Sequence, residues 1–124
     1  VIQQCLLNGC EVFVDFGDNS RIDLIINNGN LHTVQVKCLN PSEGKITLEL
    51  VKSGPNYNFK YKITDIDWFA VVNAKIPTEI AWIPSTILND YSKSIKLRVE
   101  PTKNNQVKGI NWFRDYQNFP FTDG

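Results

Sequence analysis

The order of apolar and polar residues over 21–38 predicts a β-hairpin. Two runs rich in apolar and β-branched residues flank the turn cluster Asn27-Asn28-Gly29-Asn30. In the second run, successive side chains should point to opposite faces of a sheet. One face then carries Val34, Val36 and Cys38, and the other carries Leu31, Thr33, Gln35 and Lys37.

Asp23 stands among isoleucine and leucine residues in the first strand, where a carboxylate is costly unless it is paired or bound to a metal. The hairpin loop decides which face its side chain joins. A two-residue loop at 28–29 puts Asp23 opposite Val34, whereas a three-residue loop puts it opposite Thr33 or Gln35. Because the cluster holds a glycine that can adopt a left-handed conformation, we predict a three-residue loop.

Elsewhere the periodicity predicts short elements separated by turns. Alternation predicts strands over residues 11–16, 45–52, 68–73, 79–83 and 94–99. Helical spacing predicts a helix from Val1 to about Gly9, a helical turn at 64–67, a short helix at 84–89 and a helical segment from residue 105 onward. Residues 53–59, with Gly54-Pro55-Asn56, predict a loop.

The 124 residues predict one domain over 1–124, with 93–124 as a basic C-terminal extension of it. No apolar run approaches the roughly 20 residues of a membrane span. Three cysteines with no CxxC and a single histidine argue against a zinc cluster, and predict reduced, buried thiols in a cytoplasmic protein. Since the chain starts at Val1 and contains no Met, we expect that an N-terminal segment, including part of the first helix, precedes it.

Charge is balanced overall but polarised along the chain. Residues 1–23 contain four acids and one base, whereas residues 93–114 contain six bases and Glu100. A net charge of zero argues weakly against nucleic-acid binding, because phosphate contacts supply most non-specific affinity. The polarity instead suggests an acidic metal site and a basic surface, or simply a solvated basic face.

Asp23, Gln35 and Lys37 together suit metal-assisted phosphodiester hydrolysis. Mg²⁺ takes oxygen ligands and bridges to substrate phosphate. A neighbouring lysine can stabilise developing charge or orient the attacking water. The alternative is an ordinary surface hairpin with scattered polar residues, because a D-x11-Q-x-K pattern is short and common.

The segments GDNSRIDLII, VQVKC, YKITDIDWFAVV and EIAWIP occur in an order that resembles the PD-(D/E)XK nucleases. The resemblance is to the branch of homing endonucleases associated with group I introns, and it covers about residues 5–84. It implies an α/β fold with a restriction-endonuclease-like core, in which helices flank a central mixed β-sheet.

The resemblance also assigns roles to residues of the hairpin. Asp23 would bind the metal, Gln35 would occupy the position where most of the superfamily has Asp or Glu, the Val36 carbonyl would be a further ligand, and Lys37 would be the catalytic lysine. The acidic residue that the family carries on its first helix would lie before Val1, because no Glu occurs between Val1 and Cys10.

The implied function is a sequence-specific, Mg²⁺-dependent endonuclease of the intron homing type that cuts double-stranded DNA as a homodimer or homotetramer. The residues expected to contact DNA are Lys45, Lys52, Tyr57, Lys60, Lys62, Lys93, Lys96, Arg98, Lys103 and Lys108. Alternatives are a junction-resolving or repair nuclease on the same fold, and a non-catalytic DNA-binding or assembly module.

Other polar and aromatic residues are expected to be structural. Asp67 precedes an apolar strand and should stabilise a turn, and Trp82 and Trp112 should be core or interface residues. His32 should lie on the valine face of the hairpin, where a role as general base is the minor alternative.

Overall fold

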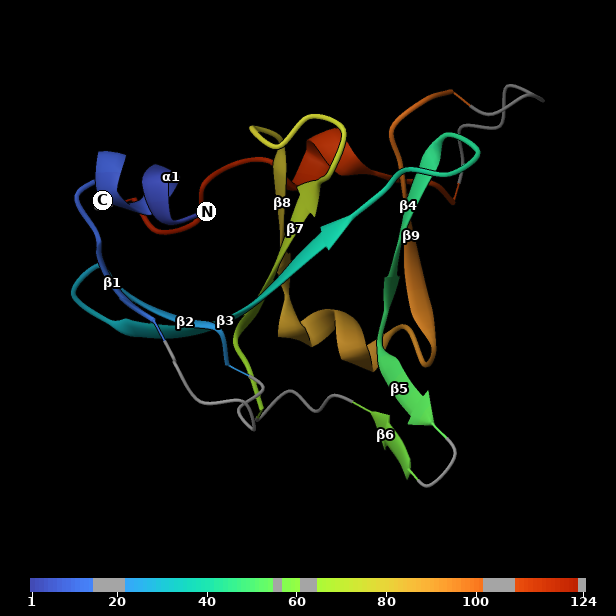
Figure 1. Ribbon diagram of the computed structural model, residues 1–124, viewed down its shortest axis with the longest axis horizontal. Helices are drawn as coiled ribbons and strands as arrows, with labels where there is room; N and C mark the ends of the chain where they lie inside the picture. The colour runs from blue at the N-terminus through green and yellow to red at the C-terminus, as the bar shows by residue number, and fades with distance from the viewer. Residues whose placement is uncertain (15–21, 55–56, 61–64, 102–108, 123–124) are drawn as a thin grey trace.

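A five-stranded mixed sheet in the order β1-β2-β3-β7-β8 forms the centre of the fold (Figure 1). The computed structural model describes residues 1–14, 22–54, 57–60, 65–101 and 109–122, with the backbone alone for 52–54 and 57–60. The strands of the central sheet are β1 (Glu11–Val14), β2 (Leu24–Asn27), β3 (Leu31–Leu39), β7 (Trp68–Asn73) and β8 (Ile80–Pro84). Strands β3 and β7 are parallel, and the other neighbours are antiparallel.

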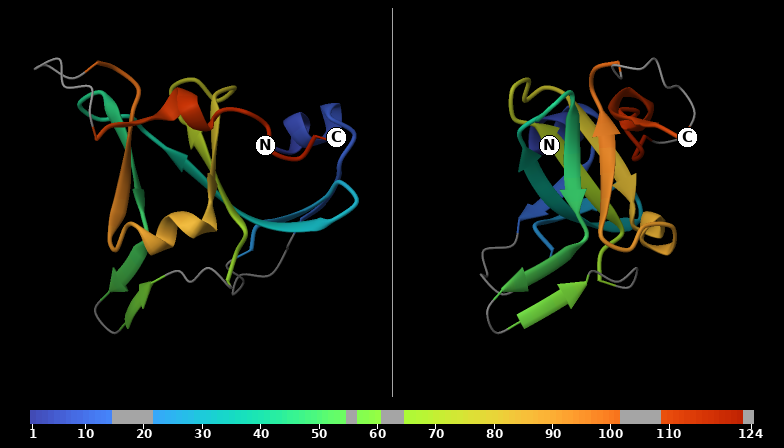
Figure 2. Two further views of the ribbon diagram at one scale, coloured as in Figure 1. Left: turned by 180° about the vertical axis from the view of Figure 1, so that it is seen from behind. Right: turned by 90° about the vertical axis from the view of Figure 1, so that its right-hand side faces the viewer.

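A second sheet has three strands in the order β10-β9-β4. They are β4 (Lys45–Glu49), β9 (Ser94–Arg98) and β10 (Asn111–Trp112). A separate hairpin of β5 (Val51–Gly54) and β6 (Tyr57–Lys60) projects away from the body (Figures 1 and 2). The helical elements are α1 (Ile2–Leu7) and the 3-10 turns η1 (Ser85–Asn89) and η2 (Phe113–Tyr116).

Each face of the central sheet is covered by a hydrophobic cluster. Between the two sheets, residues of β4, β7, β8 and β9 pack with Leu88 of η1 and Phe113 of η2. On the opposite face, Leu24, Ile26 and Val34 pack beneath α1 and the C-terminal segment. Phe121 of that segment is 1% exposed and lies against the rings of His32, Trp68, Trp82 and Phe119.

The β2–β3 hairpin has the predicted three-residue loop. Asn27 pairs with Leu31, which leaves residues 28–30 as the loop, and Gly29 has a φ of 109°. The side chain of Asn27 accepts the Gly29 N–H at 3.0 Å, so the Asx turn supports this geometry. The loop at 28–30 is one of the two three-residue loops that the sequence allowed. The paired residues end at Leu24 with Val34, and the Asp23 N–H donates to the Val34 carbonyl and does not continue the ladder.

The structure confirms the central mixed sheet but describes little helix. Within the described ranges, α1 is the only α-helix, and the second sheet, in place of helices, covers one face of the central sheet. None of the described helices is long and apolar enough to cross a membrane.

Several predicted elements differ from those observed. The predicted strand 45–52 is divided at Leu50 into β4 and β5, and most of the predicted loop 53–59 belongs to the β5–β6 hairpin. Of the predicted helical turn at 64–67, Thr64 lies outside the described residues, and Asp65 lies in a turn that is not followed by helix at Ile66 and Asp67. The predicted C-terminal helix is replaced, where the structure describes it, by β10 and η2, because Asn111 and Trp112 pair with β9.

Candidate functional site

Gln35 and Lys37 lie on the face of β3 that is turned toward the second sheet. In the parallel register, Gln35 pairs with Phe69 and Lys37 pairs with Val71, and both partners belong to the cluster between the sheets. Val34, by contrast, belongs to the cluster on the opposite face. The predicted alternation of the two faces of this strand is therefore observed.

The side chain of Gln35 is buried without a hydrogen bond to its carbonyl oxygen. The residue is 7% exposed, and Oε1 has no hydrogen-bond partner among the residues that the structure describes. A buried polar atom without a partner is destabilising by about 1–3 kcal/mol, so such atoms are uncommon and often mark a site for an ion or for chemistry. This oxygen is also the kind of ligand that Mg²⁺ prefers.

The carboxylate of Asp23 lies against the backbone of the same strand. Its Oδ2 accepts the N–H of Val36 at 2.7 Å, and the Asp23 N–H donates to the Val34 carbonyl at 2.9 Å. Since the Val36 N–H belongs to the peptide group that joins Gln35 to Val36, the carboxylate sits beside the Gln-Val-Lys segment. The fold thus brings Asp23 to the residues with which the sequence grouped it.

A metal ion at this site would be held by few charges. Within the described part of the chain, no three His, Cys, Asp or Glu side chains gather in a way that could hold a metal. The predicted ligands are instead one carboxylate, one amide oxygen and one backbone carbonyl. This oxygen-only set fits Mg²⁺, but it offsets less of the cost of removing water from the ion than a pair of carboxylates would.

A hydrogen-bonded clamp fixes β3 against β7 two residues before Gln35. Oδ2 of Asp67 accepts the backbone N–H of Thr33 at 2.9 Å and the Thr33 hydroxyl at 3.2 Å. In return, the Asp67 N–H donates to the Thr33 side-chain oxygen and to the Thr33 carbonyl, both at 3.0 Å. The predicted structural role of Asp67 is confirmed by these contacts.

The residues predicted to contact DNA are dispersed over the second sheet and the projecting hairpin. Lys45 is half-buried at the start of β4, and Lys93 and Lys96 are exposed on or beside β9. Lys52, Tyr57 and Lys60 belong to the β5–β6 hairpin, where the backbone alone is described. The predicted contacts at Lys62, Lys103 and Lys108 lie outside the described residues.

Arg98 has a structural use that the sequence did not indicate. Its guanidinium donates to the carbonyl oxygens of Glu43, Glu100 and Pro101 at 3.1–3.2 Å. These bonds tie the turn at 43–44 to the end of β9. Arg98 therefore contributes a positive charge whose position is held by the fold.

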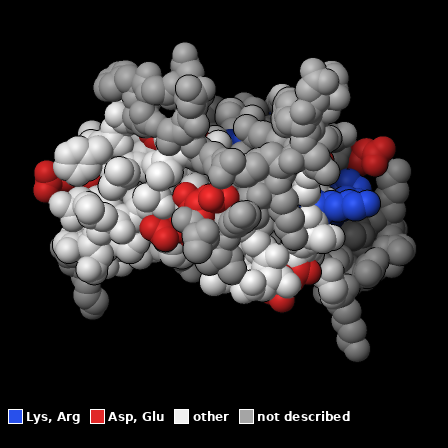
Figure 3. Space-filling model, turned by 90° about the horizontal axis from the view of Figure 1, so that it is seen from below, with Lys and Arg blue, Asp and Glu red and all other residues white. Residues whose placement is uncertain are grey.

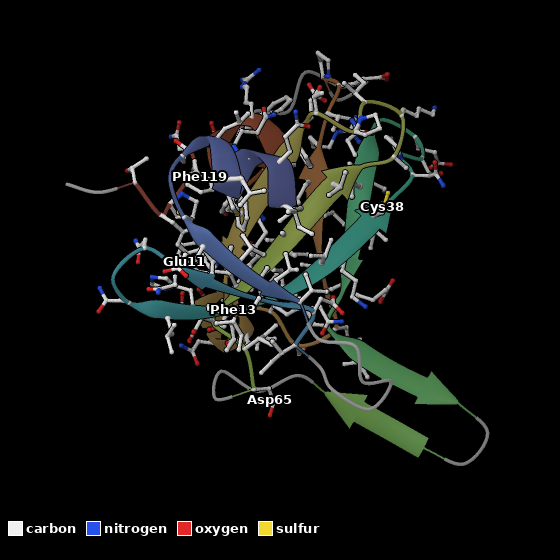
Figure 4. All side chains as sticks on the ribbon, turned by 60° about the vertical axis from the view of Figure 1, so that its left-hand side comes forward. Glu11, Phe13, Cys38, Asp65 and Phe119 are labelled. Carbon is white, nitrogen blue, oxygen red and sulfur yellow. The ribbon has the colours of Figure 1, made fainter. Side chains whose placement is uncertain are left out.

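Acidic and basic side chains are distributed differently over the lower face. Figure 3 shows acidic side chains at the left, the centre and the right of this face, while most of the visible basic atoms lie at the right, the side of β4 and β9. Asp65 lies at the lower edge of the body, near the start of β7 (Figure 4). The visible basic atoms are thus concentrated on one side, whereas the acidic side chains are spread across the face.

The other aromatic predictions are confirmed in part. Trp82 is 2% exposed, and its indole N–H donates to Gln4 Oε1 at 3.3 Å. His32 lies on the valine face, where its ring is 4.7 Å from that of Phe121 and its Nε2 is 3.1 Å from Asn28 Oδ1. Trp112 is half-buried beneath the guanidinium of Arg114, with 4.5 Å from Cζ to the ring centroid.

The cysteines are all free thiols, but they are not all buried as predicted. Cys5 on α1 and Cys10 just after it are buried, and Cys38 is exposed near the end of β3 (Figure 4). Burial, together with a smaller effect of the neighbouring Cys10, raises the pKa of the Cys5 thiol to about 11.

Comparisons with known proteins agree with the geometry. Residues 1–119 match the family model of the PD-(D/E)XK endonucleases. The fold is similar to that of the solved bacterial homing endonuclease I-Ssp6803I, with a TM-score of 0.74 and 21% sequence identity over 94% of this chain and 80% of that one. No curated protein matches the chain. Because the family model spans nearly the whole sequence, the chain belongs to the PD-(D/E)XK endonuclease family.

Proposed function

We propose that this protein is a Mg²⁺-dependent, sequence-specific endonuclease that cuts both strands of DNA, as homing endonucleases do. The observation that carries the proposal is the buried Oε1 of Gln35, which lacks a partner among the described residues and lies on the strand where Asp23 binds the Val36 N–H. Family membership supports a nuclease, and the similarity of fold to a homing endonuclease supports the homing type.

In this proposal each residue of the hairpin has a distinct task. Asp23, Oε1 of Gln35 and the Val36 carbonyl would hold the ion, and the bond from the Val36 N–H would fix the orientation of the Asp23 carboxylate. A bound Mg²⁺ supplies Lewis acidity toward the phosphate and lowers the pKa of a coordinated water. Lys37, on the same face of β3 as Gln35, would donate a hydrogen bond from its ammonium group to the negative charge that develops on the phosphate.

DNA would be bound by the basic side of the molecule. The projecting β5–β6 hairpin carries Lys52, Tyr57 and Lys60, and a two-stranded ribbon of this kind fits the major groove. Lys45, Lys93 and Lys96 would contact phosphates and position the protein on the duplex. Cutting both strands requires two active sites, so we expect a homodimer or homotetramer on a pseudo-palindromic target.

The experiment is cleavage of a library of duplexes with Mg²⁺, followed by sequencing of the ends. The test variant is Lys37→Ala, and the matched control is Lys75→Ala, which removes an exposed lysine of the turn between β7 and β8 that is not expected to contact DNA. Lys37→Ala should lower turnover about a hundredfold while it leaves DNA affinity within about twofold, because it removes a donor to the transition state. Equal cleavage by both variants would exclude Lys37 from catalysis, and ends without a common sequence would exclude sequence-specific cutting.

A further inference from the structure

A polar concavity lies on the second sheet, on the side that faces away from the central sheet. It has a volume of about 480 Å³ and is lined by Lys45, Tyr91, Ser94, Lys96, Arg98, Gly109, Ile110 and Asn111. Strand β4 supplies the first of these residues, β9 supplies three, and the segment at 109–111 closes one side. In Figure 2 (right) this sheet is nearest the viewer.

Strand alternation explains why the lining is polar. In β9, Ile95 and Leu97 are buried in the cluster between the sheets, so Ser94, Lys96 and Arg98 point the other way. The antiparallel register sets Lys45 directly opposite Arg98. Like charges placed opposite each other are destabilising unless an anion or another group compensates them.

The electrostatics of the concavity favour an anion. Three of its lining residues are cationic, and none of those that the structure describes is acidic. The guanidinium of Arg98 is held in place by three backbone carbonyls, so its charge is fixed at one wall. Lys96 is exposed and Lys45 is half-buried, which leaves both ammonium groups on flexible stems around the opening.

Neutral donors complete the lining. Asn111 donates from Nδ2 to the Tyr91 hydroxyl at 2.8 Å, which fixes the position of that oxygen and leaves the Tyr91 O–H as a donor. The Ser94 hydroxyl lies at the same concavity. Fixed hydroxyl donors among lysines are the groups that bind the oxygens of a phosphate ester.

We propose that this concavity is a phosphate-ester site that binds the DNA backbone outside the position of cleavage. The inference rests on the proposed function, because it identifies the ligand as a phosphodiester of the bound duplex. Strand β4 lines the concavity through Lys45 at its start, and its other end leads within two residues into the projecting hairpin. A free phosphorylated small molecule has the same chemistry and is distinguished by the test.

The test compares binding of a duplex and of a deoxynucleoside 5′-monophosphate to the whole protein. Lys45→Gln/Lys96→Gln should lower duplex affinity and reduce the salt slope by about two, because each neutralised phosphate contact contributes about 0.9 to the slope. Tyr91→Phe should lower affinity about three- to tenfold with the slope unchanged, because a neutral hydroxyl releases no counterion. Lys75→Gln is the control: an exposed lysine of the turn between β7 and β8 that does not line the concavity and is not expected to contact DNA.

The outcomes separate the possibilities. Loss of slope in the double variant, loss of affinity in Tyr91→Phe and little change in Lys75→Gln support the site. Chemical-shift changes at Tyr91 and Asn111 with the monophosphate but not with the duplex support a phosphate-ester site and overturn its DNA source. A double variant that changes affinity and slope no more than Lys75→Gln does, with Tyr91→Phe like wild type, overturns the site altogether. If the proposed function is wrong, the protein still binds the duplex at this concavity but does not cleave DNA.

Discussion

Replacing Asp67 tests whether its clamp on Thr33 fixes the strand that carries Gln35. Asp67→Ala removes the acceptor of two hydrogen bonds, from the Thr33 N–H and from its hydroxyl. A buried hydrogen bond to a charged acceptor contributes about 1.5–3 kcal/mol, and a bond at an exposed residue such as Asp67 contributes less. We therefore expect the loss of both bonds to lower the free energy of unfolding by about 2 kcal/mol. Asp67→Asn retains one side-chain oxygen and should cost about 1 kcal/mol.

The assay is urea unfolding followed by tryptophan fluorescence, with Thr33→Val and the double variant completing a cycle. Because Thr33→Val removes the hydroxyl that both partners share, the two changes together should cost about 0.5–1 kcal/mol less than the sum of the single changes. Glu49→Ala, an exposed carboxylate on β4, is the control and should change the free energy of unfolding by less than about 0.5 kcal/mol. Additive effects, or a loss in Asp67→Ala no larger than in the control, would refute the clamp.

Three further predictions concern the cluster beneath α1 and the thiols. Phe121→Ala should lower the free energy of unfolding by about 3 kcal/mol in urea, because it empties a site ringed by Trp68, Trp82 and Phe119. Iodoacetamide should label only Cys38 of the three cysteines in the native protein, as read by mass spectrometry, and labelling of Cys5 or Cys10 at the same rate would contradict their burial. Since the folded-state pKa of Cys5 is raised from 9.0 to about 11, its contribution to stability is complete below pH 9 and should be lost as pH rises toward 11. Unfolding curves of wild type and Cys5→Ala should differ in this pH dependence.

The hairpin and the central strands were predictable because local signals agreed with tertiary packing. The turn cluster at 27–30 predicted a three-residue loop but left two registers open, and the apolar run from Trp68 to Asn73 predicted β7 with its observed bounds. Asp23 was grouped with Gln35 and Lys37 from their residue types and spacing. These features depend on residues close in sequence or on a two-residue period, which a single chain displays directly.

Other features arise only from distant contacts. The division between β4 and β5 at Leu50 was missed because the alternation of residues 45–52 continues through it. The C-terminal segment has helical spacing, but pairing with β9 and the left-handed backbone of Gly109, at φ 71°, give β10 in its place. Arg98 donates a hydrogen bond to the Glu43 carbonyl, and Asn111 donates one to the Tyr91 hydroxyl. Both bonds join residues that are too far apart in the sequence for a spacing pattern to indicate them.

Gln35→Met tests the central claim, that the buried amide oxygen is a metal ligand. The change keeps the length of the side chain and removes the oxygen that has no partner among the described residues. Without metal, the variant should therefore unfold at the wild-type temperature or above it, since an unpaired buried polar atom is gone. A structural role for the amide predicts the opposite, a loss of stability.

The measurement is a Mg²⁺ titration of thermal unfolding and of duplex cleavage for wild type and Gln35→Met. The account predicts that Mg²⁺ raises the unfolding temperature of wild type but not of the variant, and that cleavage by the variant falls about a hundredfold. A variant that is destabilised without metal, yet cleaves DNA at the wild-type rate with the wild-type requirement for Mg²⁺, would contradict the metal site at Asp23 and Gln35.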